Sequence, residues 1–247
     1  MKALNKKILV TGGGSGIGFA IAKAFAAKGN QLILAGINED KLKKAVSLIP
    51  NASYIVCDVS NQNDVKQLVK KINEQYGSID ILVNNAGVAQ PHSLTETSGL
   101  YENAKYEMEI NFLSVVRLTE ELLPILIKRE EAAIINIQSI LSYLPSLNIA
   151  TYSASKAALH SYSQALRLAL EKAHPQIKLF EVFPPYVDTE MARAIQSDKL
   201  SPDEVANDIV EAVEKNEFAI RNGKTKNLYE LYLQSPENAL KVLNGVN

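Results

Sequence analysis

The chain of 247 residues contains one cysteine, three histidines and no tryptophan. The single cysteine, Cys57, cannot form a disulfide within the chain, and this scarcity indicates a reducing compartment. Scattered histidines and one cysteine cannot assemble a Cys/His zinc site, so we expect no bound metal. A chain of this length buries a full core without such cross-links.

An excess of one charge and long apolar runs are missing as well. Lys and Arg total 26 against 27 Asp and Glu, for a net charge of −1. No basic excess exists to neutralise a phosphate backbone, so we expect no nucleic-acid partner. No apolar run approaches the about 20 residues of a membrane span. The run at residues 8–10 is also too short for a signal-peptide core. We therefore expect a cytoplasmic protein without a membrane partner.

The chain does contain short apolar runs that alternate with helical patterns. The runs predict strands at residues 8–11, 31–36, 53–57, 79–83, 133–138, 177–183 and 218–220. The helical patterns predict helices at residues 17–28, 41–48, 65–72, 105–128, 152–173, 205–213, 226–234 and 236–243. The long helix at 105–128 is expected to break or kink near Pro124.

This alternation predicts an α/β fold. We expect a doubly wound sheet of about seven mostly parallel strands with helices on both faces. No repeat or linker interrupts the pattern, so residues 1–247 are expected to form a single domain, with residues 221–247 as a C-terminal helical extension. Ligands of such sheets bind outside the carboxyl ends of the strands, so the loops at those ends are expected to face one cleft.

A glycine-rich loop follows the first predicted strand, in the order Gly12-Gly13-Gly14-Ser15-Gly16-Ile17-Gly18. Glycines let the backbone approach a pyrophosphate, and the helix that begins there offers free N–H groups. The spacing fits the general dinucleotide fingerprint only loosely, and a glycine-rich turn without a ligand is the alternative. No Lys-Ser/Thr pair follows, which excludes a P-loop.

Tyr152 and Lys156 lie four residues apart in a predicted helix, which places them on one face. An ammonium near a phenol stabilises the phenolate, so we expect Lys156 to lower the pKa of Tyr152. Such a tyrosine exchanges a proton with an alcohol or carbonyl oxygen, and Ser139 can hydrogen-bond the same oxygen. Taken alone, the Tyr-Lys pair also fits an ordinary amphipathic helix.

Asn111 lies inside the predicted long helix, with apolar neighbours on both sides. An asparagine in mid-helix competes for backbone hydrogen bonds, and a buried amide needs partners. We therefore expect Asn111 to be buried, with a kink or a widened hydrogen-bond ladder, and with its side chain directed towards Lys156.

These features resemble the short-chain dehydrogenase/reductase family. The residues that carry the resemblance span about residues 8–190 and comprise the glycine loop, Asp58-Val59, Asn84-Asn85-Ala86-Gly87, Asn111, Ser139, Tyr152 and Lys156. The resemblance implies a Rossmann-type fold that binds NAD or NADP. It also implies hydride transfer between the nicotinamide and a small-molecule secondary alcohol or carbonyl.

The resemblance further implies a role for each matched residue. Tyr152 is the general acid/base, Lys156 lowers its pKa and binds the nicotinamide ribose, and Ser139 positions the substrate oxygen. Asn111 holds a water that links Lys156 to solvent. The implied cofactor contacts are Gly12, Ser15, Gly16, Ile17, Gly18, Ile37, Asn38, Asp58, Val59, Asn85, Ala86, Gly87, Tyr152, Lys156, Pro184, Val187 and Thr189.

The double proline Pro184-Pro185 and the C-terminal stretch are similar to a narrower subgroup, named after the oxidoreductase of the teichoic-acid D-alanylation cluster. Pro185 stands where the family usually has glycine, which is expected to stiffen the loop beside the nicotinamide. The chain also lacks the family's usual C-terminal ending, which takes part in tetramer formation. A homodimer through the two long helices is therefore favoured over a homotetramer.

The choice between NAD and NADP is left open by the residues after the second predicted strand. Relatives specific for NAD carry an aspartate where this chain has Gly36. Relatives specific for NADP carry an arginine where this chain has Ile37, or a basic residue where it has Ser15. Lys41 is nearby but is expected to be a solvated surface residue. We therefore expect weak discrimination between the two cofactors.

Two other functions compete with the dehydrogenase. A non-catalytic dinucleotide-binding sensor or scaffold would not need the complete Asn-Ser-Tyr-Lys set. An epimerase or dehydratase of nucleotide sugars would need a larger C-terminal substrate domain. The substrate pocket is expected to be apolar, because residues 140–147 and Tyr186 follow two strand ends. The segment between Thr189 and Pro202 is expected to form a small lid rather than a deep cavity.

Overall fold

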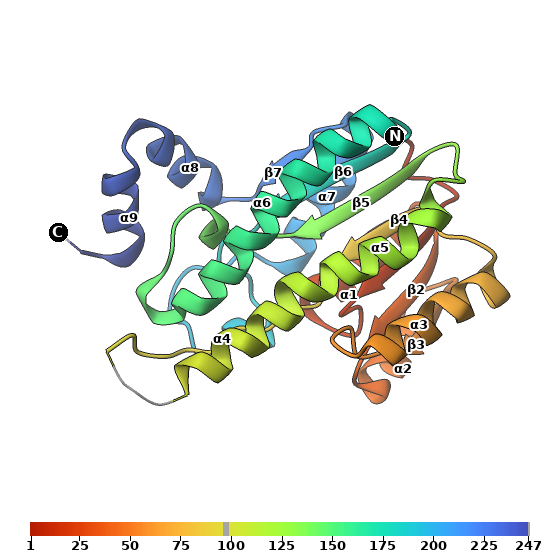
Figure 1. Cartoon of the computed structure of the whole chain (residues 1–247), viewed down its shortest axis with the longest axis horizontal. Coiled ribbons are helices and arrows are strands. Elements are labelled where there is room, and N and C mark those ends of the chain that lie inside the picture. Colours follow the sequence, from red (N-terminus) through yellow and green to blue (C-terminus); the bar gives the residue numbers. More distant parts are fainter. Residues whose placement is uncertain (96–98, 247) are drawn as a thin grey trace.

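The apolar runs of the sequence form one parallel sheet in the computed structural model, which describes residues 1–95 and 99–246 (Figure 1). The strand order is β3-β2-β1-β4-β5-β6-β7, and every neighbouring pair is parallel. The strands are β1 (Lys7–Thr11), β2 (Gln31–Gly36), β3 (Ala52–Val56), β4 (Ile81–Asn84), β5 (Ala132–Ile137), β6 (Ile177–Phe183) and β7 (Ala219–Arg221). The chain reverses its direction of winding between β3 and β4, so β1 and β4 flank the switch point where such folds bind ligands.

Helices cover both faces of this sheet. The α-helices are α1 (Gly16–Ala26), α2 (Glu39–Ser47), α3 (Gln62–Lys71), α4 (Leu100–Met108), α5 (Ser114–Leu126), α6 (Ala150–Ala173), α7 (Pro202–Lys215), α8 (Lys224–Gln234) and α9 (Pro236–Asn244). One buried core joins the sheet to α1, α2 and α7, and a second joins its other face to α3, α5 and α6. The predicted fold class is confirmed, and the sheet is parallel throughout the described residues.

The long predicted helix begins five residues earlier than predicted and contains the widened turn that was expected at Asn111. It begins at Leu100, and a π-helical turn, η2 (Glu109–Leu113), separates α4 from α5. The predicted break near Pro124 is wrong, because α5 continues through Pro124 and ends at Leu126. A proline removes only the hydrogen bond to the carbonyl four residues earlier, here that of Glu120, and the bond from Ile127 N to Leu123 O at 2.9 Å shows that the helix continues past it.

The C-terminal helices α8 and α9 lie outside the two layers. In Figure 1 they stand beyond the end of the sheet towards which β5 points. Each begins and ends within two residues of its predicted bounds. The last residue of the predicted extension, at position 247, lies outside the described residues.

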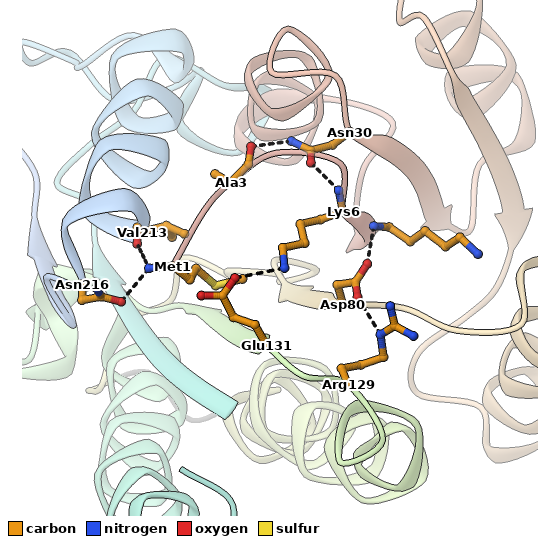
Figure 2. A network of polar contacts seen from close by, with 10 residues as sticks. Met1, Ala3, Lys6, Asn30, Asp80, Arg129, Glu131, Val213 and Asn216 are labelled. Carbon is orange, nitrogen blue, oxygen red and sulfur yellow. Dashed lines mark hydrogen bonds and ion pairs between the residues drawn. The ribbon is translucent and has the colours of Figure 1, made fainter. Parts of the chain in front are cut away.

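A polar network ties the amino ends of β1 and β4 together, at the opposite end of the sheet (Figure 2). Asp80 precedes β4 and is only 4% exposed. Its carboxylate accepts from the backbone N–H of Lys7 at 2.8 Å and from Arg129 Nε at 2.7 Å. The amino group of Met1 donates to Val213 O and Asn216 Oδ1, which joins the start of the chain to the end of α7.

The described residues contain neither a membrane-spanning helix nor a metal-binding cluster. None of the helices there is long and apolar enough to cross a membrane. The same part of the chain holds no group of histidine, cysteine and acidic side chains that is placed to bind a metal.

Removal of the Asp80 carboxylate is expected to destabilise the protein without touching the other end of the sheet. Asp80→Ala leaves the buried N–H of Lys7 unpaired, so the free energy of unfolding should fall by about 2–3 kcal/mol in urea titrations. Asp80→Asn keeps one acceptor oxygen, so its free energy of unfolding should fall by less. The control is Glu131→Gln, which removes the more exposed ion pair with Lys6 and should cost at most about 1 kcal/mol. Equal losses from Asp80→Ala and Glu131→Gln would contradict this account.

Candidate active site

The glycine loop after β1 is locked to the segment after β4. Thr11 Oγ1 accepts from the backbone N–H groups of Asn85 and Ala86, at 2.9 and 3.0 Å. The Asn85 side chain donates to Thr11 O at 2.8 Å. A Cβ at Gly12 would lie 2.8 Å from Asn85 Nδ2, and one at Gly18 would lie 2.4 Å from Gly12 O. These two positions therefore require glycine because the backbones approach too closely for a side chain.

Helix α1 begins directly behind this loop. Ser15, which precedes its first turn, makes no side-chain capping hydrogen bond, and that turn contains no acidic residue. The free N–H groups and the positive end of the helix dipole therefore face the loop without a competing carboxylate. This arrangement suits an anionic group such as a pyrophosphate.

The π-helical turn η2 places Asn111 against the segment after β4. Asn111 is fully buried, its Oδ1 accepts from Val88 N, and its Nδ2 donates to Val88 O, both at 2.9 Å. The same Nδ2 also lies 2.9 Å from Ser155 Oγ, beside Lys156 in α6. The predicted burial and widened hydrogen-bond ladder at Asn111 are confirmed. Its side chain reaches the residue before Lys156 and not the ammonium itself.

Three side chains from β5 and α6 meet at the carboxyl end of the sheet. Ser139 follows β5 and begins the 3₁₀ turn η3 (Ile140–Ser142), where its Oγ accepts from Leu141 N. Tyr152 and Lys156 lie one turn apart in α6, with Lys156 Nζ 5.7 Å from the centre of the Tyr152 ring. The ammonium of Lys156 donates to Ile137 O at 2.8 Å.

Burial governs the pKa values of this group. It raises the pKa of Tyr152 to about 12, against a smaller lowering by a hydrogen bond with Ser139. It also lowers the pKa of Lys156 to about 8. In the protein without cofactor, burial therefore outweighs any lowering of the pKa of Tyr152 by Lys156, and the expected effect of Lys156 stays a prediction. Both groups lose solvation, while the ammonium is directed to a carbonyl of β5.

A cleft of about 1230 Å³ joins these parts. Of the residues predicted to form the site, the cleft is lined by Gly12, Ser15, Gly16, Ile17, Asn85, Ala86, Gly87, Ser139, Tyr152, Lys156, Pro184, Val187 and Thr189. The glycine loop and the Ser-Tyr-Lys group therefore face the same space.

Six predicted residues do not line this cleft. Gly18 lies in the first turn of α1, close to the backbone of Gly12, and Asn111 binds both backbone groups of Val88. Ile37 is 74% exposed at the end of β2, and Asn38 Oδ1 caps α2 by accepting from Lys41 N at 2.9 Å. Asp58 and Val59 lie beyond β3, where one carboxylate oxygen of Asp58 accepts from both N and Oγ of Ser60.

Sequence reasoning missed Glu107, which lies four residues before Asn111. Its side chain is fully buried, and Oε1 accepts from Gln90 N at 2.7 Å. Its negative charge also raises the pKa of Tyr152. The helical spacing between Glu107 and Asn111 was the available signal, because it places both polar groups on one face.

Sequence reasoning also missed the size of the cleft. The expected lack of a deep cavity is wrong, since α8 and α9 contribute a wall that includes Leu228, Leu231, Val242 and Leu243. The segment between Thr189 and Pro202, expected to form a small lid, also lines the cleft. The predicted apolar character is supported by Ile140, Leu141 and Tyr186, which also line it. His160 does not line the cleft and packs against Tyr143 and Phe183, with Nδ1 2.6 Å from Glu181 Oε2.

The family model described as short chain dehydrogenase matches residues 6–200, which include the glycine loop, Asn111, Ser139, Tyr152 and Lys156. The chain belongs to the short-chain dehydrogenase family. As a member of this family, it is an oxidoreductase that acts on CH–OH and C=O groups.

Curated relatives within the short-chain dehydrogenase family share about a third of the sequence. The chain is 36% identical to the uncharacterized oxidoreductase DltE of Bacillus subtilis over 76% of this chain and 74% of that protein. This likeness confirms the predicted resemblance to the narrower subgroup. The chain is also 34% identical to a fatty acyl-CoA reductase of Acinetobacter baylyi, over 85% of this chain and 73% of that protein.

Solved structures of short-chain dehydrogenases share the fold. One from Burkholderia phymatum, in complex with NAD, superposes with a TM-score of 0.87 at 24% identity and covers 99% of this chain and 97% of that one. Another from Burkholderia cenocepacia, in complex with NADP, gives a TM-score of 0.86 at 24% identity, with 98% of each chain covered.

The lowered pKa of Lys156 predicts a pH-dependent stability. The unfolded chain keeps the ordinary lysine pKa near 10.5, so between about pH 8 and pH 10.5 it binds more protons at this site than the folded protein does. Stability of the wild type relative to Lys156→Met should therefore rise with pH in that window, by about 3 kcal/mol in all. Urea titrations of both proteins at a series of pH values measure this difference.

The control for this measurement is Lys66→Met, which removes an exposed lysine on α3. Its stability difference from the wild type should stay level over the same pH range. A level difference for Lys156→Met as well would show that the buried ammonium is not destabilised.

Proposed function

We propose that the protein is an NAD(P)-dependent oxidoreductase that transfers a hydride between nicotinamide C4 and the carbon of a secondary alcohol or carbonyl substrate. Tyr152 is the general acid/base of this reaction. The observation that carries the proposal is the shared cleft, in which Ser139, Tyr152 and Lys156 face the same space as Gly12 and Gly16 of the glycine loop.

The residues around the cleft fit a dinucleotide. The free first turn of α1 and the backbone of the glycine loop suit its pyrophosphate. Asp58 and Val59 are assigned to the adenine, and the backbone from Asn85 to Gly87 to the adenosine ribose. Lys156 is assigned to the nicotinamide ribose, and Pro184, Val187 and Thr189 to the nicotinamide ring and its carboxamide. The bound nicotinamide supplies the hydride for reduction or accepts it in oxidation.

The assigned role of Tyr152 as proton donor rests on its place in the cleft beside Ser139 and Lys156. At neutral pH the phenol is protonated and has a proton available for a carbonyl oxygen as hydride reaches the carbon. Ser139 hydrogen-bonds the same oxygen and stabilises the charge that develops there. In alcohol oxidation the phenolate of Tyr152 accepts the proton of the alcohol. A positive charge nearby favours the phenolate form.

Asn111 and Lys156 are assigned to the path that returns a proton to Tyr152. A Cβ placed on Gly87 would lie 3.1 Å from Asn111 Oδ1 and 3.8 Å from Lys156 Nζ, so both atoms border one small space. A water there accepts from Lys156 and donates to Asn111, whose other hydrogen bonds hold its amide in place.

The end of β2 supports the use of both cofactors. Gly36 offers no carboxylate to the ribose hydroxyls, and Ile37 offers no cation to a 2′-phosphate. Lys41 forms an ion pair with Glu190 at 2.7 Å, so its ammonium is not free to bind a 2′-phosphate. The solved relatives that bind NAD in one case and NADP in the other are consistent with either choice.

Tyr152→Phe is expected to lower kcat by about 10²–10⁴-fold, because only the acid/base hydroxyl is removed. The dissociation constant for NADH or NADPH, measured by fluorescence titration, should change by less than about twofold. Tyr101→Phe, at an exposed position on α4, is the matched control and should retain full activity. A Tyr152→Phe enzyme that keeps more than about a tenth of the wild-type kcat would rule out Tyr152 as the proton donor.

A further inference from the structure

The C-terminal helices use two different faces of α8. Leu228 and Leu231, three residues apart, line the cleft. Tyr229 and Tyr232, also three residues apart, contact the ring of Tyr143, with ring centres at 4.6 and 6.2 Å. Residues three apart share a helix face, so α8 has an aliphatic face towards the cleft and an aromatic face towards Tyr143.

Arg221 fastens the aromatic face of α8 to the sheet. Its guanidinium lies 3.7 Å from the centre of the Tyr229 ring and 5.6 Å from that of Tyr143. The Tyr143 ring in turn stacks on Phe183 of β6 at 4.6 Å. A guanidinium between aromatic rings is attracted to their faces, and this attraction is stronger where water is excluded.

The other end of the helical pair is fastened to the same segment of chain. Asn244, the last residue of α9, accepts from Leu147 N at 2.8 Å and donates to Pro145 O at 3.0 Å. Tyr143, Pro145 and Leu147 all lie between Ser139 and Tyr152 in the sequence. The aliphatic wall is therefore held in a fixed position relative to the two residues that meet the substrate oxygen.

We propose that this wall, formed by Leu228, Leu231, Val242 and Leu243, selects substrates that carry an aliphatic chain on the reacting carbonyl. The inference rests on the proposed function and adds the substrate class. These four lining side chains are aliphatic and carry no charge. The two polar lining residues of α8 stay in water, since Lys224 pairs with Asp198 at the surface and Asn227 is exposed. A hydrocarbon chain leaves water along such a wall without leaving a polar group unpaired.

The test is the dependence of kcat/KM on chain length, for straight-chain methyl ketones from butanone to decanone with NADH and with NADPH. Each methylene that leaves water should raise kcat/KM of the wild type about three- to fourfold until the wall is filled. In the double variant Leu228→Gln, Leu231→Gln this increase should fall to less than about twofold per methylene. Both side chains are half-buried, so the variant is expected to fold.

Leu233→Gln is the matched control, since Leu233 lies on α8 but is 65% exposed and outside the cleft. Its chain-length dependence should equal that of the wild type. Arg221→Gln tests the anchor and should weaken the dependence as the double variant does. If Leu233→Gln weakens the chain-length dependence of kcat/KM as much as the double variant does, the effect comes from a destabilised α8 and the proposed role of the wall is wrong.

The failure of this inference can be told apart from failure of the proposed function. If butanone is reduced but kcat/KM does not rise with chain length, the proposed role of the aliphatic wall is wrong, while the proposed hydride transfer is supported. If no ketone is reduced, calorimetric affinities of the matching secondary alcohols for the NAD-loaded protein decide the question. A gain in affinity with chain length would support the wall, and a level series would overturn it.

Discussion

The segment that follows β4 is hydrogen-bonded on one side to the glycine loop and on the other side to α4 and η2. The geometry of the site depends on these two sets of hydrogen bonds. From the β1 side, Thr11 and the side chain of Asn85 close the glycine loop onto it. From the α4 side, Asn111 binds both backbone groups of Val88, and Glu107 binds the N–H of Gln90. One piece of backbone thus connects the loop assigned to the pyrophosphate with the helix that carries Tyr152 and Lys156.

Burial sets the chemistry of the residues brought together there. In water an ammonium near a phenol would favour the phenolate, but here both groups have lost solvent, and each is shifted towards its neutral form. The buried charge of Glu107 acts on Tyr152 in the same direction. A protonated Tyr152 suits carbonyl reduction. In the proposed reaction, the positive charge of an oxidised nicotinamide would favour the phenolate, which would couple the role of Tyr152 to the state of the cofactor.

The sequence was sufficient for the sheet and the residue types of the site, because both depend on local patterns. Seven strands were placed within about two residues, and the widened ladder at Asn111 followed from a polar residue among apolar neighbours. Contacts between residues far apart in the chain could not be predicted from the sequence. The position of α8 and α9 over the cleft depends on Arg221 meeting Tyr143 and Tyr229, and the pKa of Tyr152 depends on how much water the assembled fold excludes.

The central claim is that hydride passes from the nicotinamide to the substrate carbon in this cleft. The most direct measurement is the fate of deuterium when a methyl ketone is reduced with NADH or NADPH that carries deuterium at both C4 positions. The account predicts one deuterium on the carbinol carbon of the product, located by mass spectrometry and NMR, with the hydroxyl hydrogen taken from solvent. A product whose carbinol carbon carries only solvent hydrogen would contradict it.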